Sequence, residues 1–173
     1  DRDPPPVYAI TSARPAEVGA GQVGPVRLTL DAGHPDRWVY FDFSRGATVE
    51  EPRPGGWDLA FRRFHVTTNG GPGFAGRGAA IDLGDVPLDA VGVLPDSGWT
   101  VADGDSVNAA LARWYDYGFV SHLLTPRART YGIRTADGRF AAIRFLSYYC
   151  PGPTPGCVTF EYVYRGDGSR RLD

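Results

Sequence analysis

Apolar and polar residues alternate along much of the chain, which is the pattern of strands with one buried face. In the segment 26–31, the three residues on one face are apolar and the three on the other are polar. The same alternation appears in the segments 37–44, 79–83, 129–135, 139–149 and 158–165. The stretch from Trp57 to Thr68 predicts a further long strand, and Asp137-Gly138 predicts a hairpin turn between two alternating runs. The sequence therefore predicts a mainly β fold, a single domain built as an antiparallel meander with long hairpins.

One short helix is expected within this β fold, over Ser106–Tyr115. Asp105 or Ser106 is suited to cap its first turn, and the alanine and leucine content supports about two turns.

The first 25 residues differ from the rest because they are rich in proline, glycine and alanine and show no sustained period. Such a composition is typical of a linker, so we expect residues 1–25 to be a flexible tether and residues 26–173 to form the β domain. The chain has no methionine, even at position 1. This absence suggests an N-terminus made by removal of a secretory signal, so membrane association would come only from an anchor upstream of Asp1.

Composition excludes several classes of function. The formal net charge is −2, which gives no basis for a nucleic-acid partner. No apolar run reaches the roughly 18 residues that a membrane-spanning helix needs. No serine lies in a nucleophile elbow and no HExxH motif occurs, so we expect a protein that is not an enzyme.

The two cysteines indicate where the protein works. Cys150 and Cys157 bracket the loop Pro-Gly-Pro-Thr-Pro-Gly between two strand-like runs. We expect a disulfide that closes this loop, because the alternative, a metal site with two thiolates, lacks a nearby histidine or third cysteine. A disulfide predicts an extracytoplasmic location, in the periplasm or on the outer-membrane surface.

Several segments occur together in a characteristic order. The chain contains TLDAG, WVYFDFSRG, WDLAFRRFHVTTNGG and GRGAAID, followed by TYGIRTADGRFAAIRFLSYY and GCVTFEYVYRGDG. This ordered set, from Val26 to Arg165, resembles the HmuY family, extracytoplasmic lipoproteins whose founding members are haem-binding haemophores of Gram-negative bacteria. The resemblance implies an all-β fold with a small helical element, a surface-attached or secreted protein, and haem as the ligand.

The resemblance also implies where haem ligands should lie. Haem-binding members use two axial residues, histidine or methionine, on loops between the Gly-rich segment and the C-terminal meander. In this chain the interval 84–114 contains neither residue type, and Tyr115-Asp116-Tyr117 follows it directly.

Haem iron needs a nitrogen, sulfur or phenolate donor in an apolar pocket. His34 lies in a turn-like stretch and is a weak candidate. His65 lies on a predicted strand, where half-buried packing is the alternative role. His122 follows an aromatic-rich segment, and its alternative role is a structural bond to a backbone carbonyl. Tyr117 is a further candidate, with packing as its alternative.

Two functions follow from these observations. Because the interval 84–114 lacks axial ligands, the first expectation is a protein-interaction or accessory subunit of an envelope protein complex. The alternative is a haem- or tetrapyrrole-binding protein that uses His122, with His65 and Tyr117 as further contacts. In that case Arg127 and Arg129 are the expected partners of the haem propionates.

Overall fold

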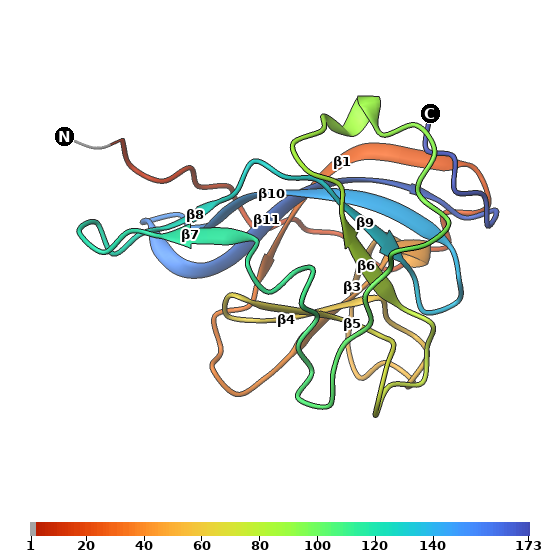
Figure 1. The fold of residues 1–173 in the computed structure, drawn as a ribbon. Helices are drawn as coiled ribbons and strands as arrows, with labels where there is room; N and C mark the ends of the chain where they lie inside the picture. Colours follow the sequence, from red (N-terminus) through yellow and green to blue (C-terminus); the bar gives the residue numbers. More distant parts are fainter. Residues whose placement is uncertain (1–2) are drawn as a thin grey trace.

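The structure, a computed structural model, describes residues 3–173, so the first two residues of the predicted linker lie outside it. The chain forms two antiparallel sheets and a separate two-stranded hairpin (Figure 1). The strands are β1 (Gln22–Asp31), β2 (Val39–Asp42), β3 (Ala47–Val49), β4 (Leu59–Arg62), β5 (His65–Thr68), β6 (Ala79–Asp82), β7 (Tyr115–Tyr117), β8 (Leu124–Pro126), β9 (Tyr131–Arg134), β10 (Phe140–Cys150) and β11 (Thr154–Arg165). Two 3-10 helices of three residues each, η1 (Phe43–Arg45) and η2 (Leu88–Ala90), complete the described elements.

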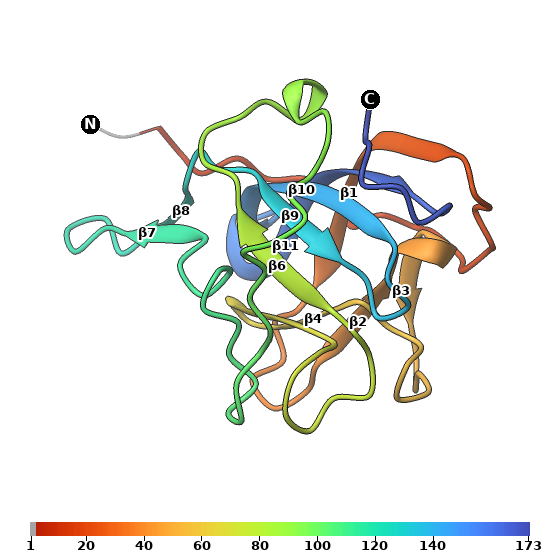
Figure 2. The same ribbon diagram turned by 45° about the vertical axis from the view of Figure 1, so that its right-hand side comes forward.

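The larger sheet has five strands in the order β1-β11-β10-β9-β6, and the smaller has four in the order β3-β2-β4-β5. β10 is the middle strand of the larger sheet, and it pairs with β11, the longest strand. This arrangement confirms the predicted antiparallel meander and its mainly β class. Figure 2 shows the smaller sheet packed beneath the larger one.

The core lies between the two sheets and is rich in aromatic rings. Phe41 of β2 and Phe61 of β4 both contact Phe160 of β11, with ring centroids 5.3 Å and 5.6 Å apart. All three side chains are fully buried. Burying a phenylalanine contributes roughly 1.5–3 kcal/mol, so these contacts are a major part of what holds the sheets together.

Asp58, just before β4, links three separate parts of the core. Its carboxylate accepts hydrogen bonds from the backbone N–H groups of Phe43, at 2.8 Å, and Ala136, at 2.9 Å. The pKa of Asp58 is raised to about 7, mainly by burial and also by the nearby Asp42, while the two backbone hydrogen bonds oppose the shift. Asp58 therefore joins the start of β4 by hydrogen bonds to η1 and to the turn between β9 and β10.

The outer face of the larger sheet is also covered. A small apolar cluster there is formed by Leu88, Leu94, Ala142, Val163 and Leu172. It joins η2 and the C-terminal residues to β10 and β11, so these strands are buried on both faces.

The helix expected over Ser106–Tyr115 is wrong: the segment is a series of turns, and β7 begins at Tyr115. The buried Asn108 explains the difference. Its amide donates to the Thr68 hydroxyl and to the Thr100 carbonyl, both at 2.9 Å. These bonds tie the segment to the body of the protein, and a helix of this length gains little stability alone. No helix among residues 3–173 has the length and apolar character to cross a membrane.

The stretch from Trp57 to Thr68 is also not one strand. It forms the hairpin β4–β5, in which Arg62 pairs with His65 across a two-residue turn of Arg63 and Phe64. Arg63 adopts a left-handed backbone conformation with φ 54°. Because such turns usually contain glycine or asparagine, the sequence here carries no turn pattern to detect.

The N-terminal segment expected to be a linker is packed on the domain where the structure describes it. The Thr11 N–H donates to the Thr29 carbonyl of β1 at 2.9 Å, and Val18 N–H donates to the Ser44 carbonyl at 3.0 Å. β1 begins at Gln22, four residues before the predicted start of the domain. These contacts occur at isolated positions, which is why no periodic pattern marks them.

β1 is one edge of the larger sheet and β6 is the other, and a loop residue pairs with β6. Ala80 and Thr100 exchange two backbone hydrogen bonds, each of 2.8 Å.

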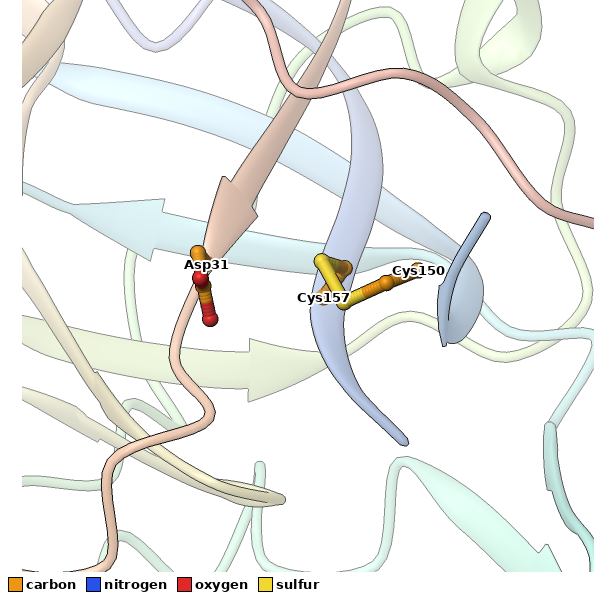
Figure 3. Close-up of side chains that lie close together, drawn as sticks. All are labelled: Asp31, Cys150 and Cys157. Atoms are coloured by element: carbon orange, nitrogen blue, oxygen red, sulfur yellow. A yellow bond between two sulfur atoms is a disulfide. The ribbon is translucent and has the colours of Figure 1, made fainter. Parts of the chain in front are cut away.

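The predicted disulfide between Cys150 and Cys157 is confirmed, with a Cα–Cα distance of 4.8 Å. Figure 3 shows that Asp31, at the end of β1, lies beside it. Because both sulfurs are bonded to each other, they are not available as thiolate ligands of a metal. The Asp31 carboxylate instead accepts a hydrogen bond from the Gly33 N–H at 2.9 Å.

Candidate ligand-binding pocket

The hairpin β7–β8 projects from one end of the molecule (Figure 1). Tyr117 pairs with Leu124, and the loop between them is closed by a hydrogen bond from the Gly118 N–H to the Leu123 carbonyl at 2.9 Å. The Leu124 N–H donates to the Tyr149 hydroxyl at 2.8 Å. This buried hydrogen bond attaches the hairpin to the end of β10.

A pocket of about 410 Å³ lies where this hairpin meets the body of the protein. Its walls come from the β4–β5 turn, the β7–β8 hairpin and the adjoining ends of β10 and β11. The aromatic and imidazole side chains in the lining are Phe64, Tyr115, Tyr117, His122, Tyr148 and Tyr149. The volume is within the usual range for small-molecule sites, and the aromatic lining favours a flat apolar ligand.

His122 and Tyr117, two of the predicted site residues, are brought together in this pocket. The Tyr117 hydroxyl shares a hydrogen bond of 3.0 Å with His122 Nδ1. His122 Nε2 has no hydrogen-bond partner among residues 3–173. A metal-ligating histidine generally has its second ring nitrogen held by such a partner, which sets the orientation of the ring. His122 also has a left-handed backbone conformation, with φ 55°, so the loop holds it in an uncommon geometry.

His65, the third predicted site residue, lines a neighbouring pocket of about 290 Å³ with Trp38 and Arg62. Phe64 and Tyr115 belong to the linings of both pockets and lie between them. Partial burial lowers the pKa of His65, and the positive charge of Arg62 lowers it further. His65 is thus an uncharged imidazole near neutral pH, but outside the pocket that holds His122.

Arg127 and Arg129, the expected partners of haem propionates, do not line the pocket of His122. Arg127 donates to the Arg113 carbonyl at 3.3 Å. Arg129 forms an ion pair with Asp82 at 2.8 Å. The cation that lines the pocket is Arg63, from the β4–β5 turn.

Burial disfavours two tyrosines of the lining as iron ligands. It raises the pKa of both Tyr115 and Tyr148 above the usual range of a phenol. Tyrosine binds ferric iron as the phenolate, so a raised pKa opposes ligation. The exposed imidazole of His122 needs no such ionisation and is the better donor.

Comparison with known proteins agrees with this architecture. The family model described as HmuY protein matches residues 34–162, most of the chain. This chain belongs to the HmuY family. No curated protein sequence matches it.

Solved structures show the HmuY-like fold. The apo HmuY analog of Tannerella forsythia superposes with a TM-score of 0.67 at 18% identity, covering 83% of this chain and 96% of its own. A Bacteroides vulgatus protein described as HmuY-like and haem-binding gives 0.62 at 22% identity, covering 87% and 95%. A Bacteroides fragilis protein described as a lipoprotein gives 0.60 at 21% identity, covering 86% and 93%. At these identities the likeness shows the fold alone.

The pocket residues of this HmuY-family chain that were not anticipated from its sequence include Arg63, Phe64, Tyr148 and Tyr149. Arg63 and Phe64 could not be recognised as turn residues, because the β4–β5 turn lacks the glycine or asparagine that usually marks such a turn. Tyr148 and Tyr149 lie within a strongly alternating strand, where aromatic residues are usual. The pairing of β10 with β11 shifts register between Ser147 and Tyr149, which interrupts strict alternation and lets both rings line the pocket.

Proposed function

We propose that this protein binds haem in the pocket beside the β7–β8 hairpin, with His122 Nε2 as the donor to the iron. The observation that carries the proposal is the hydrogen bond between Tyr117 and His122 Nδ1, which leaves Nε2 as the free nitrogen. The aromatic lining suits the faces of a porphyrin, and neutral imidazole is the commonest proximal ligand of haem iron. Membership of the HmuY family supports the same ligand, because a structural neighbour is described as haem-binding.

The roles of the pocket residues follow from their positions. His122 would hold the haem, which would supply an iron able to bind a protein nitrogen. Tyr117 orients the His122 ring, while Phe64, Tyr115 and Tyr148 provide apolar contact area. We propose a role in binding and carriage, without catalysis.

A haem titration followed by the Soret band tests the proposal. We expect a Soret shift on addition of haem to the full chain, and we expect His122→Ala to weaken binding by tenfold or more, roughly the effect of losing a ligand or its supporting bond. His34→Ala is the matched control, because His34 lies outside the pocket and accepts a hydrogen bond from the Asp36 N–H. His65→Ala tests for a second iron ligand from the neighbouring pocket.

Two results would count against the proposal. If the wild type gives no Soret shift, haem is not the ligand. If His122→Ala still binds haem as tightly, His122 is not the iron donor.

A protein-docking role is the second candidate, and the tip of the β7–β8 hairpin favours it. Phe119 and Val120 are 87% and 78% exposed at this tip. Large apolar side chains that project together into solvent are typical of interaction sites. This role corresponds to the accessory subunit expected from the sequence, and the proposed partner is a protein of the envelope. A negative charge introduced at the tip, as in Val120→Asp, would abolish docking and leave the haem titration unchanged.

An extracytoplasmic location is part of the same proposal. The disulfide between Cys150 and Cys157 supports it, since such bonds persist outside reducing compartments. The likeness to a Bacteroides fragilis lipoprotein also supports attachment to the envelope.

A further inference from the structure

Arg63 is a cation without a counter-ion in an otherwise aromatic pocket. Among the described lining residues it is the one with a permanent charge. Its guanidinium donates to the Gly33 carbonyl at 3.1 Å, and it forms none of the ion pairs found within residues 3–173. A guanidinium presents up to five N–H donors in a planar fork, so most of its donors remain free.

The hydroxyl of Tyr148 is a second unpartnered polar group at the same place. Tyr148 is 3% exposed, and its hydroxyl has no hydrogen-bond partner among the described residues. The Arg63 guanidinium lies over the Tyr148 ring, 5.8 Å from its centroid. Burial raises the pKa of this phenol by more than the adjacent Arg63 guanidinium lowers it, so the hydroxyl keeps its proton and remains a donor. A buried hydroxyl without a partner is uncommon and requires an explanation.

We infer that Arg63 and Tyr148 form a subsite for a carboxylate of the ligand. A carboxylate accepts two parallel hydrogen bonds from a guanidinium, and it offers lone pairs to a phenolic O–H as well. The inference rests on the proposed tetrapyrrole pocket and narrows its ligand to a planar macrocycle that bears an acid group. The hydroxyl has no contact with solvent in the free protein, so binding of the carboxylate requires the side chains around it to move.

The test separates recognition of the acid from ligation of the iron. The probes are metal-free protoporphyrin IX, which has two carboxylates, and its dimethyl ester, which has none. Binding to the full chain is followed by quenching of tryptophan fluorescence. The variants are Arg63→Gln, Arg63→Lys and Tyr148→Phe, and Arg127→Gln is the matched control because Arg127 lies outside the pocket.

We expect the wild type to bind the acid about tenfold or more tightly than the ester, the effect of a charge-assisted hydrogen bond. Arg63→Gln should abolish this preference by weakening acid binding alone, and Tyr148→Phe should reduce it. Arg63→Lys, which keeps the charge, should retain part of the preference, and Arg127→Gln should retain all of it.

Several results would overturn the inference. One is equal affinity of the wild type for the acid and the ester. Another is that Arg63→Gln weakens binding of the acid and the ester equally. A third is that Arg63→Gln keeps the wild-type preference for the acid. The proposed function fails separately. Arg63-dependent binding of the acid together with a haem spectrum unaffected by His122→Ala would refute the iron donor and keep the carboxylate subsite. If no porphyrin of any kind binds, both proposals are wrong.

Discussion

Replacing Tyr148 by phenylalanine should stabilise the free protein, which is unusual for a change at a buried position. The substitution removes only the hydroxyl, which has no hydrogen-bond partner in the described structure. The aromatic contacts of the ring stay in place, including Trp114 at 6.2 Å and Tyr149 at 5.7 Å between centroids. An unsatisfied buried polar group costs about 1–3 kcal/mol, because its hydrogen bond to water in the unfolded state is not replaced.

We therefore expect the free energy of unfolding to rise by about 1 kcal/mol, since the small cavity left by the oxygen offsets part of the gain. For a domain of this size the corresponding rise in Tm is roughly 2–4 °C. Urea unfolding of the ligand-free protein, followed by tryptophan fluorescence, measures the change.

The neighbouring tyrosine provides the matched control. The Tyr149 hydroxyl accepts a hydrogen bond from the Leu124 N–H, so Tyr149→Phe leaves that buried donor unpaired. We expect this variant to lose about 1–2 kcal/mol. If Tyr148→Phe is destabilised as much as Tyr149→Phe, the Tyr148 hydroxyl has a partner in solution and the reasoning is refuted.

Three further predictions concern stability. The double variant Cys150→Ser/Cys157→Ser should lose about 2.5 kcal/mol in urea unfolding, the loop entropy for a sequence separation of 7, and thiol titration of the unreduced wild type should find no free cysteine. Because the folded-state pKa of Asp58 is raised from 3.8 to about 7, its contribution to stability is greatest below about pH 4 and is lost as the pH rises to 7. The loss is about 4 kcal/mol at about 1.4 kcal/mol per pKa unit, and a pH series showing the same slope in Asp58→Asn would contradict this assignment. Asn108→Ala should lose about 2–4 kcal/mol in the same assay, because it removes three side-chain hydrogen bonds that are buried or partly buried, and a change below about 0.5 kcal/mol would show that the turn does not depend on them.

The sequence predicted the long strands better than the short ones. β1, β10 and β11 have ten or more residues, so alternation along them is unmistakable. β7 and β8 have three residues each, too few for any period to appear. The sequence therefore did not predict the hairpin that carries His122, whose side chain lines the pocket.

The pocket was harder to predict than the fold because its residues come from distant parts of the chain. Arg63, His122 and Tyr148 meet only after three hairpins have formed. Arg127 and Arg129 lie near His122 in sequence, but each finds a local partner on the surface. Proximity along the chain was thus a poor guide to which cation lines the pocket. The helix wrongly predicted at 106–115 has a similar cause. Its alanine content favours a helix locally, but the hydrogen bonds of Asn108 to distant residues hold the segment in turns.

The backbone pairings at the two sides of the larger sheet limit how this protein can associate. An uncovered outer strand is a template on which another chain can extend the sheet, and natural proteins guard against this. Here the Thr11 backbone occupies the carbonyl of Thr29 on β1, and Thr100 occupies both backbone groups of Ala80 on β6. Partners are therefore denied the route of strand addition at these positions. At these two positions, association with another chain would instead have to use side chains.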